Sequence, residues 1–226
     1  MELIWHGHAF FEINCNDRKI LVDPFIGGNP ACDIDVNSIT EAHLVLVSHG
    51  HQDHLGEAFE ICKKTGAKLV ANYEITEEAR DFGIEALEPM NIGGGIKTDG
   101  FKIRMTEALH SSGPGRGHAA GFVISYNNLA VYHAGDTGLF YGMKLIGELY
   151  SPDVALLPIG DRFTMGPREA ARAAELIRAQ QVIPMHYNTF PPIEQQPEEL
   201  TALTGSRAEV VILNPGDSHL LKKDND

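Results

Sequence analysis

Short apolar runs alternate with amphipathic segments along the whole chain. Runs rich in β-branched and aromatic residues predict strands at positions 2–5, 10–14, 19–22, 44–47, 68–71, 101–106, 121–125, 129–133, 154–157, 182–185 and 209–213. Apolar residues at helical spacing predict helices at positions 55–65, 76–82, 143–149, 167–179 and 197–204. Strands lie close together in the first half and alternate with helices later. This order favours two mixed sheets with helices outside over a doubly wound parallel sheet.

Glycine and proline mark the loops between these elements. They are concentrated at positions 27–30, 93–95, 113–117 and 135–142, which we expect to be loops. No stretch resembles an interdomain linker, and no repeat of fixed period is found. The sequence therefore predicts a single domain that spans residues 1–226.

Composition narrows the classes of protein that the chain can belong to. Hydrophobic residues make up 43% of the chain, enough for a sizeable core and too many for a disordered protein. The formal net charge is −13, which argues against coating of long nucleic acids or binding to an anionic membrane. Eleven histidines beside a single tryptophan are the feature of the composition that needs explaining.

Cysteine usage and the N-terminal segment suggest a compartment. The three cysteines form no CxxC pair, so a disulfide framework is not expected and a reducing environment is favoured. The chain begins without a basic and apolar leader, and no run of apolar residues is long enough to cross a membrane. We therefore expect a cytoplasmic protein with no membrane association.

The densest group of candidate ligands is the segment His49-Gly50-His51-Gln52-Asp53-His54. It directly follows the apolar run 44–47, so three imidazoles and a carboxylate are gathered at the end of a buried strand. Metal coordination satisfies such groups together, whereas burial without partners is costly. A solvated loop with incidental histidines is the alternative, and this spacing after a strand disfavours it.

Three further candidate ligands occur at similar places in the chain. His110 follows the strand predicted at 101–106, Asp136 follows 129–133, and His186 follows 182–185. Ligands at the carboxyl ends of strands converge on one crevice, where α/β sheets commonly bind ligands. The sequence therefore predicts a metal centre with seven protein ligands.

These residues resemble the metallo-β-lactamase superfamily, whose H-x-H-x-D-H motif matches residues 49–54. Segments 7–10, 160–166 and 185–191 further resemble a family of small metal-dependent hydrolases similar to L-ascorbate-6-phosphate lactonase. The resemblance covers residues 3 to about 219. It implies an α/β fold, a four-layer αββα sandwich in which two mixed β-sheets are flanked by helices, with a dinuclear metal site at one edge.

The resemblance also implies how the ligands are shared between two metal ions. The first ion is held by His49, His51 and His110, and the second by Asp53, His54 and His186, with Asp136 bridging them. The expected cofactors are two divalent ions per chain. Zinc is favoured, and manganese, iron or nickel are alternatives because all ligands are nitrogen or oxygen donors.

The expected reaction is attack by metal-activated water on a small ester, lactone or phosphoester. Bound zinc lowers the pKa of water to about 7, and a metal pair polarises the oxygen under attack. Asp53 is predicted to orient the nucleophile and pass its proton to the leaving group. His8 and Asn188 are predicted catalytic residues, with a structural histidine and an ordinary turn residue as the alternatives.

Two arginines in predicted loops are candidate contacts for an anionic substrate. Arg116 and Arg162 suit a phosphate or carboxylate, but surface ion pairs explain them equally well. Of the other histidines, His133 is expected to pack near the site without binding metal, and His6 to be core or to support a ligand. No function is expected for His43, His118 and His219.

Three rival functions remain. The first is a phosphodiesterase or nuclease acting on nucleotides or RNA, although the acidic charge disfavours long nucleic acids. The second is redox chemistry, but related di-iron proteins typically carry an acidic residue where this chain has His51, and they carry a flavin domain. The third is a metal-binding scaffold or sensor without activity. The expected partner is a small, potentially anionic substrate, and a homo-oligomer is left open.

Overall fold

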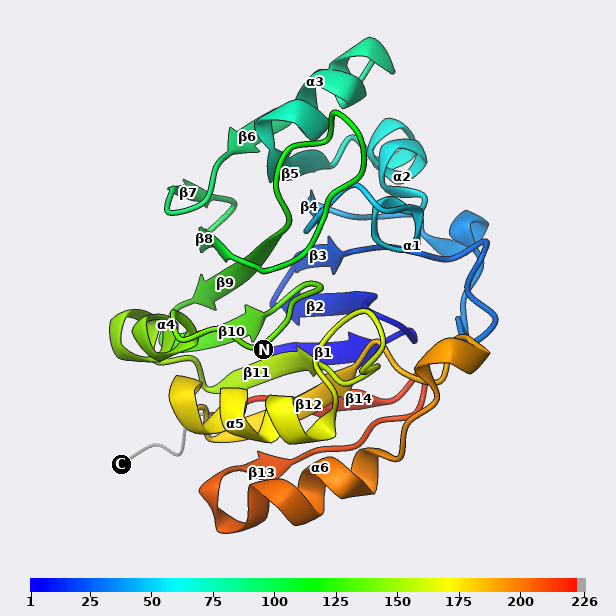
Figure 1. Ribbon diagram of the computed structural model, residues 1–226. Coiled ribbons are helices and arrows are strands. Elements are labelled where there is room, and N and C mark those ends of the chain that lie inside the picture. Colours follow the sequence, from blue (N-terminus) through cyan, green and yellow to red (C-terminus); the bar gives the residue numbers. More distant parts are fainter. Residues whose placement is uncertain (223–226) are drawn as a thin grey trace.

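Two seven-stranded β-sheets form the centre of the molecule (Figure 1). The computed structural model describes residues 1–222. In spatial order, the first sheet contains β14 (Ser218–Leu220), β1 (Glu2–Trp5), β2 (Phe11–Cys15), β3 (Arg18–Val22), β4 (Leu44–Leu46), β5 (Lys68–Asn72) and β6 (Leu87–Met90). The second contains β13 (Glu209–Val210), β12 (Gln181–Met185), β11 (Val154–Pro158), β10 (Leu129–His133), β9 (Ala120–Tyr126), β8 (Phe101–Glu107) and β7 (Gly95–Thr98).

Both sheets are mixed. Strands β3 to β6 run parallel in the first sheet, as do β10 to β13 in the second, and the remaining neighbours pair antiparallel. The central parallel strands β4 and β11 are buried along their whole length, which explains their unbroken apolar sequences. In β8, buried Phe101, Ile103 and Met105 alternate with exposed Lys102 and Arg104, as expected for a strand with one solvated face.

Helices cover the outer faces of the sheets. The helices are α1 (Gln52–Leu55), α2 (Ala58–Thr65), α3 (Tyr73–Asp81), α4 (Met143–Tyr150), α5 (Pro167–Ile177) and α6 (Pro197–Thr204), with 3₁₀ turns at Val36–Ser38, Pro191–Ile193 and Gly205–Arg207. Helix α2 packs on β4 and β5, and α5 packs on β11 with α4 and α6 beside it. Two mixed sheets flanked by helices confirm the predicted α/β fold class. Within residues 1–222, no helix is long and apolar enough to span a membrane.

The helix predicted at 55–65 is confirmed over Ala58–Thr65, but it begins later than expected, because a separate short helix ends at Leu55. Helix α1 ends at Leu55, and α2 begins at Ala58. Between them Gly56 adopts a φ of 44°, and a Cβ at this position would lie 2.3 Å from the Pro24 carbonyl oxygen. The apolar spacing continues across the break, so the pattern alone does not reveal it. The helix predicted at 167–179 also ends early, at Ile177, because Arg178 adopts the left-handed conformation.

Edge strands account for the other differences. The strand predicted at 209–213 is only Glu209–Val210, and β6, β7 and β14 were not predicted. Strand β7 begins at Gly95, inside a segment expected to be a loop. Each of these strands lies at or next to the edge of its sheet, where less of the chain is buried and the apolar pattern is weak.

Candidate metal centre

The first two predicted ligands, His49 and His51, follow the buried strand β4. His49 is fully buried, whereas His51 is half-buried two residues later. Gly50 between them is required by packing, because a Cβ there would lie 2.3 Å from the Arg116 side chain and 2.6 Å from the Ser112 carbonyl oxygen. The glycine thus lets the loop after β4 approach the glycine-rich loop 111–118 closely.

The short helix α1 carries the next two ligands. His51 is its N-cap residue, so Asp53 lies in the first turn and His54 follows it. The carboxylate of Asp53 suits the positive end of this turn. The His54 side chain is fully buried, whereas that of Asp53 is 33% exposed. The turn therefore directs the His54 side chain toward the core and leaves the Asp53 side chain partly exposed to solvent.

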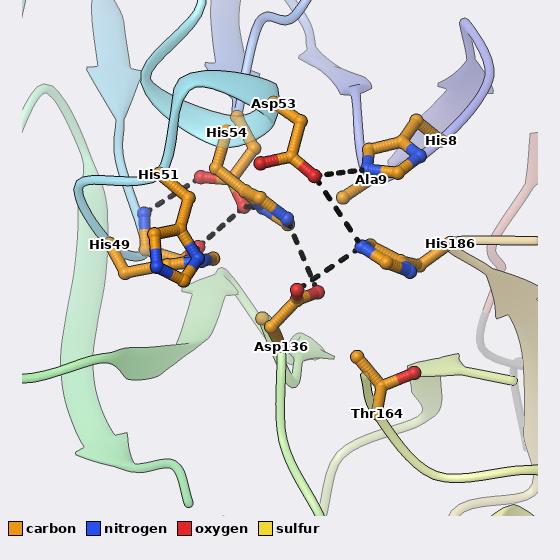
Figure 2. A network of polar contacts seen from close by, with 12 residues as sticks. His8, Ala9, His49, His51, Asp53, His54, Asp136, Thr164 and His186 are labelled. Carbon is orange, nitrogen blue, oxygen red and sulfur yellow. Dashed lines mark hydrogen bonds and ion pairs between the residues drawn. The ribbon is translucent and has the colours of Figure 1, made fainter. Parts of the chain in front are cut away.

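The structure brings all seven predicted ligands together, and Figure 2 labels all of them except His110. We call His49, His51 and His110 the first group, and Asp53, His54 and His186 the second group. The candidate ligand atoms within each group lie within 4.8 Å of one another.

Asp136 lies between the two groups. Its Oδ1 is 3.2 Å from His54 Nε2, and its Oδ2 is 3.1 Å from His186 Nε2 and 3.5 Å from His110 Nε2. Its carboxylate is therefore within reach of histidines from both groups. This arrangement is the one that the family resemblance implied for a bridging residue.

Asp23, which the sequence analysis missed, orients ligands of both groups. It is fully buried after β3 and accepts hydrogen bonds from His54 Nδ1 (2.7 Å), Ser48 N (2.7 Å) and Ser48 Oγ (2.6 Å). Because the Ser48 hydroxyl proton goes to Asp23, the His49 Nδ1–H donates to Ser48 Oγ at 3.0 Å. Both histidines therefore direct Nε2 toward other candidate ligands, His49 toward His51 Nδ1 at 3.0 Å and His54 toward Asp136 at 3.2 Å, as outer carboxylates commonly ensure at metal sites.

The loop at residues 111–118 supports the first group from outside. The Arg116 guanidinium donates to both carboxylate oxygens of Glu78, at 2.7 and 2.8 Å, and to the Gly50 carbonyl oxygen. Ser111 Oγ lies 3.3 Å from His51 Nε2. Arg116 therefore forms a structural ion pair with Glu78, which is one of the two interpretations that the sequence allowed.

His8 joins the second group through Asp53. Its side chain is fully buried, with Nε2 3.2 Å from Asp53 Oδ2 and Nδ1 2.8 Å from Thr189 Oγ1. Burial, followed by the neighbouring His186, lowers the pKa of His8 to about 4, so the ring is neutral at pH 7. The His8 carbonyl oxygen also accepts the His186 backbone N–H at 2.9 Å. Residue 8 therefore connects two members of the second group.

Asn188 lies away from these contacts. Its side chain is exposed, and its amide oxygen accepts the Gln195 backbone N–H at 2.8 Å. This is the contact of a turn residue, so its catalytic role stays a prediction without a geometric argument.

His133 is buried beside the site, where both ring nitrogens bond to backbone groups of Ala9 and Gly135. His6 bonds Asp33 at 2.7 Å.

The donor set fits divalent cations. His54 Nε2, His186 Nε2 and Asp136 Oδ1 are buried without a hydrogen-bond partner, although they lie close to one another. Burial alone lowers the pKa of His54, but the charges of Asp136 and Asp23 outweigh it and raise that pKa well above its ordinary value. The centre therefore attracts positive charge, and nitrogen and oxygen donors of this kind suit zinc and similar ions.

Comparisons with known proteins agree with this centre. The β-lactamase superfamily domain matches residues 18–187. The chain belongs to this superfamily. A UPF0173 metal-dependent hydrolase from Methanopyrus kandleri is 52% identical, over 97% of this chain and 99% of that protein. Another from Thermococcus onnurineus is 50% identical over 93% of this chain and 95% of that protein. This protein is therefore a metal-dependent hydrolase.

A solved structure shares the fold over nearly its whole length. Igni18, a metallo hydrolase from Ignicoccus hospitalis, superposes with a TM-score of 0.91 at 40% identity, covering 98% of this chain and 99% of that chain. The agreement extends beyond the family domain to both ends of the described chain. It confirms the predicted superfamily and its two-sheet fold.

Proposed function

We propose that this hydrolase uses two divalent ions to activate water for attack on a small ester, lactone or phosphoester. The observation that carries the proposal is the convergence of two ligand groups on one side chain, Asp136. The first group would hold one ion and the second group the other. Zinc is the favoured metal, with manganese, iron or nickel as alternatives.

The ions would supply Lewis-acid chemistry, which lowers the pKa of water and polarises a carbonyl or phosphoryl oxygen. The protein contributes orientation. Asp23 and Ser48 fix the rings of His54 and His49 with Nε2 inward. A preorganised centre of this kind needs little rearrangement when a substrate arrives, which favours catalysis over mere storage of metal.

Asp53 is our proposed proton carrier. Burial raises its pKa, but the hydrogen bond from His8 and the neighbouring histidines outweigh burial and hold the carboxyl ionised at neutral pH. An ionised carboxylate accepts a hydrogen bond from water and can pass the proton to a leaving group. It is the more exposed member of the second group, so it can reach both water and substrate.

His8 acts on Asp53 in this account. The ionised Asp53 carboxylate can only accept, so His8 carries its proton on Nε2 and donates to Asp53 Oδ2, and Nδ1 is left to accept from the Thr189 hydroxyl. One oxygen of Asp53 is thereby held, and the other is left for water. We therefore propose that His8 positions Asp53 and does not itself donate a hydrogen bond to the substrate.

Activity screening with parallel metal loading tests the proposal. Protein loaded with zinc, manganese, iron or nickel is offered ester, lactone and phosphodiester substrates, with cyclic nucleotides and RNA included. We expect turnover of at least one small substrate, and its loss in Asp53→Ala while at least one metal ion remains bound. Unchanged turnover in Asp53→Ala would contradict the role of that residue. A metal-loaded protein without activity on the whole panel would favour a scaffold or sensor.

A further inference from the structure

A small cavity opens directly on the metal ligands. Its volume is about 290 Å³, near the lower end for pockets that bind small molecules. It is lined by His51, Asp53, His110, Asp136 and His186 together with Ser111 and Phe163. Phe163 is the one large apolar side chain among these lining residues, and 57% of its surface is exposed.

The loop that carries Phe163 is built rigidly. The Asp161 N–H donates to the Met165 carbonyl oxygen at 3.0 Å, which closes the loop around residues 162–164. The Met165 N–H in turn donates to the carbonyl oxygen of Thr137 at 3.0 Å, and Thr137 directly follows Asp136. The backbone that carries the phenyl ring is therefore tied to the residue that follows Asp136, the ligand between the two groups. Phe163 is thus exposed at the cavity on a loop whose backbone is held by hydrogen bonds.

Thr137 anchors a second exposed apolar residue. Its hydroxyl oxygen accepts the N–H of Leu109 at 2.9 Å, and Leu109 directly precedes the ligand His110. The side chain of Leu109 is 51% exposed. Two large apolar side chains are thus attached to backbone that neighbours the metal ligands. Of the two, Phe163 lines the cavity and Leu109 lies outside its lining, and exposed apolar surface at a polar cavity is typical of a binding site.

Arg162 places a cation beside the same ring. Its guanidinium carbon lies 5.7 Å from the centre of the Phe163 ring. Within residues 1–222, no carboxylate forms an ion pair with Arg162, whereas Arg116 is bound by Glu78. A cation left free on so acidic a chain is available to an anion, and guanidinium groups suit carboxylates and phosphates.

From this juxtaposition we infer that the substrate is a small amphiphilic anion. Its apolar, preferably planar part packs against Phe163, and its carboxylate or phosphate group binds Arg162 beside that ring, while the bond to be hydrolysed faces the metal ligands. Only the statement that the hydrolysed bond faces the metal ligands rests on the proposed hydrolase function. Recognition by Phe163 and Arg162 can be measured without turnover.

Binding of 4-fluorobenzoate and 4-fluorophenylphosphonate to the zinc-loaded protein, followed by fluorine NMR, tests the inference. Acetate, which lacks a ring and carries no fluorine, is the comparison probe, and its affinity is measured by its displacement of the aryl probes. We expect Phe163→Ala to weaken binding of the aryl probes about tenfold. Arg162→Gln should weaken it about fivefold. Acetate should be less affected by Phe163→Ala than either aryl probe. The tighter of the two aryl probes identifies the preferred anionic group.

Matched controls separate the site from general surface effects. Phe82→Ala removes another half-exposed phenyl ring, and Arg172→Gln removes another exposed arginine, both outside the lining of the cavity. Both should bind the probes like the unaltered protein. Equal affinity of Phe163→Ala, Arg162→Gln and the unaltered protein for the aryl probes would overturn the inference. Because these titrations require no hydrolysis, a failure of the proposed activity would be seen separately, in the substrate panel.

Discussion

The two ligand groups are held in different ways. The second group is fastened from the core, because His54 is bonded to buried Asp23 and the His186 backbone is bonded to residue 8. In the first group, His51 and His110 lie on loops, are partly exposed, and depend on contacts such as that of Arg116 with Gly50. The second group is thus fixed by the fold, whereas in the first group only His49 is held from the core, through Ser48, and its two partners depend on loops. We expect metal bound by the first group to exchange more readily.

Removing the carboxylate between the groups should have the largest effect. Asp136→Asn keeps the size of the side chain but removes the charge that faces His54, His110 and His186. We expect metal content to fall from about two ions per chain to one or fewer, with loss of hydrolysis. Elemental analysis checks the metal content, and a full complement in this variant would contradict a bridging role.

Asp23→Asn should weaken the second group directly, through His54, and the first group through Ser48 and His49. A buried carboxylate that loses its charge leaves His54 and Ser48 poorly paired, so we expect a loss of about 3 kcal/mol in unfolding free energy and a 10- to 100-fold loss in metal affinity. Denaturant unfolding and competitive zinc titration measure the two effects. Asp99→Asn, at a partly exposed carboxylate far from the ligands in the chain, is the control. A variant as stable as the unaltered protein would show that Asp23 is dispensable.

The pH dependence of this effect has a defined sign. Burial raises the pKa of Asp23, but the charge and hydrogen bond of His54 outweigh it and lower that pKa below its ordinary value. The pKa of Asp23 is about 4 in the unfolded chain and lower in the folded one, so the ionised carboxylate stabilises the folded state at pH values above about 4. This contribution is lost as the pH falls further. In metal-free protein, the stability difference between the unaltered chain and Asp23→Asn should therefore shrink below about pH 4. A difference that grows on acidification would contradict the assignment.

Arg116→Gln should affect the loop-held half. Loss of the guanidinium frees the loop at 111–118 from Gly50 and Glu78. We expect at most about 1 kcal/mol of lost stability, because the ion pair is partly exposed, but faster release of one metal ion. Chelator-induced metal release measures this. Arg80→Gln, which removes an exposed ion pair with Glu77, should release metal at the original rate.

Thr189→Val should have the smallest effect. The valine keeps the shape of the side chain but cannot donate to His8 Nδ1, so this buried nitrogen loses its partner and the ring is held less firmly against Asp53. We expect a loss of about 1 kcal/mol in stability and a kcat that falls several-fold with little change in KM. Thr189→Ser retains the hydroxyl and should retain kcat. An equal loss in both variants would indicate a packing role for Thr189.

The ligands were predictable from sequence because each follows an apolar strand. The run 44–47 followed by His49 and His51 contains both the buried strand and its polar end, and the fold class follows from the same alternation. Asp23 was missed because an aspartate before a proline is typical of a turn. Only the pairing of β3 with β4 brings it beside Ser48 and His54.

Other features of the site depend on distances that no local pattern encodes. The contact of His8 with Thr189 joins positions 181 residues apart. Arg116 and Arg162 are equivalent as sequence, since both are cations in loops. Only packing shows that Glu78 binds Arg116, whereas Arg162 lies against the ring of Phe163. The choice between a structural and a functional arginine therefore required the structure.

The metal content of the protein during dialysis against a chelator tests the central claim most directly. After purification without chelator, we predict about two divalent ions per chain. During dialysis the content should fall to a plateau near one, because the loop-held first group releases its ion before the core-fastened second group. Well under one ion per chain at the start would contradict the metal centre itself. Loss of both ions at the same rate would contradict the difference between its two halves.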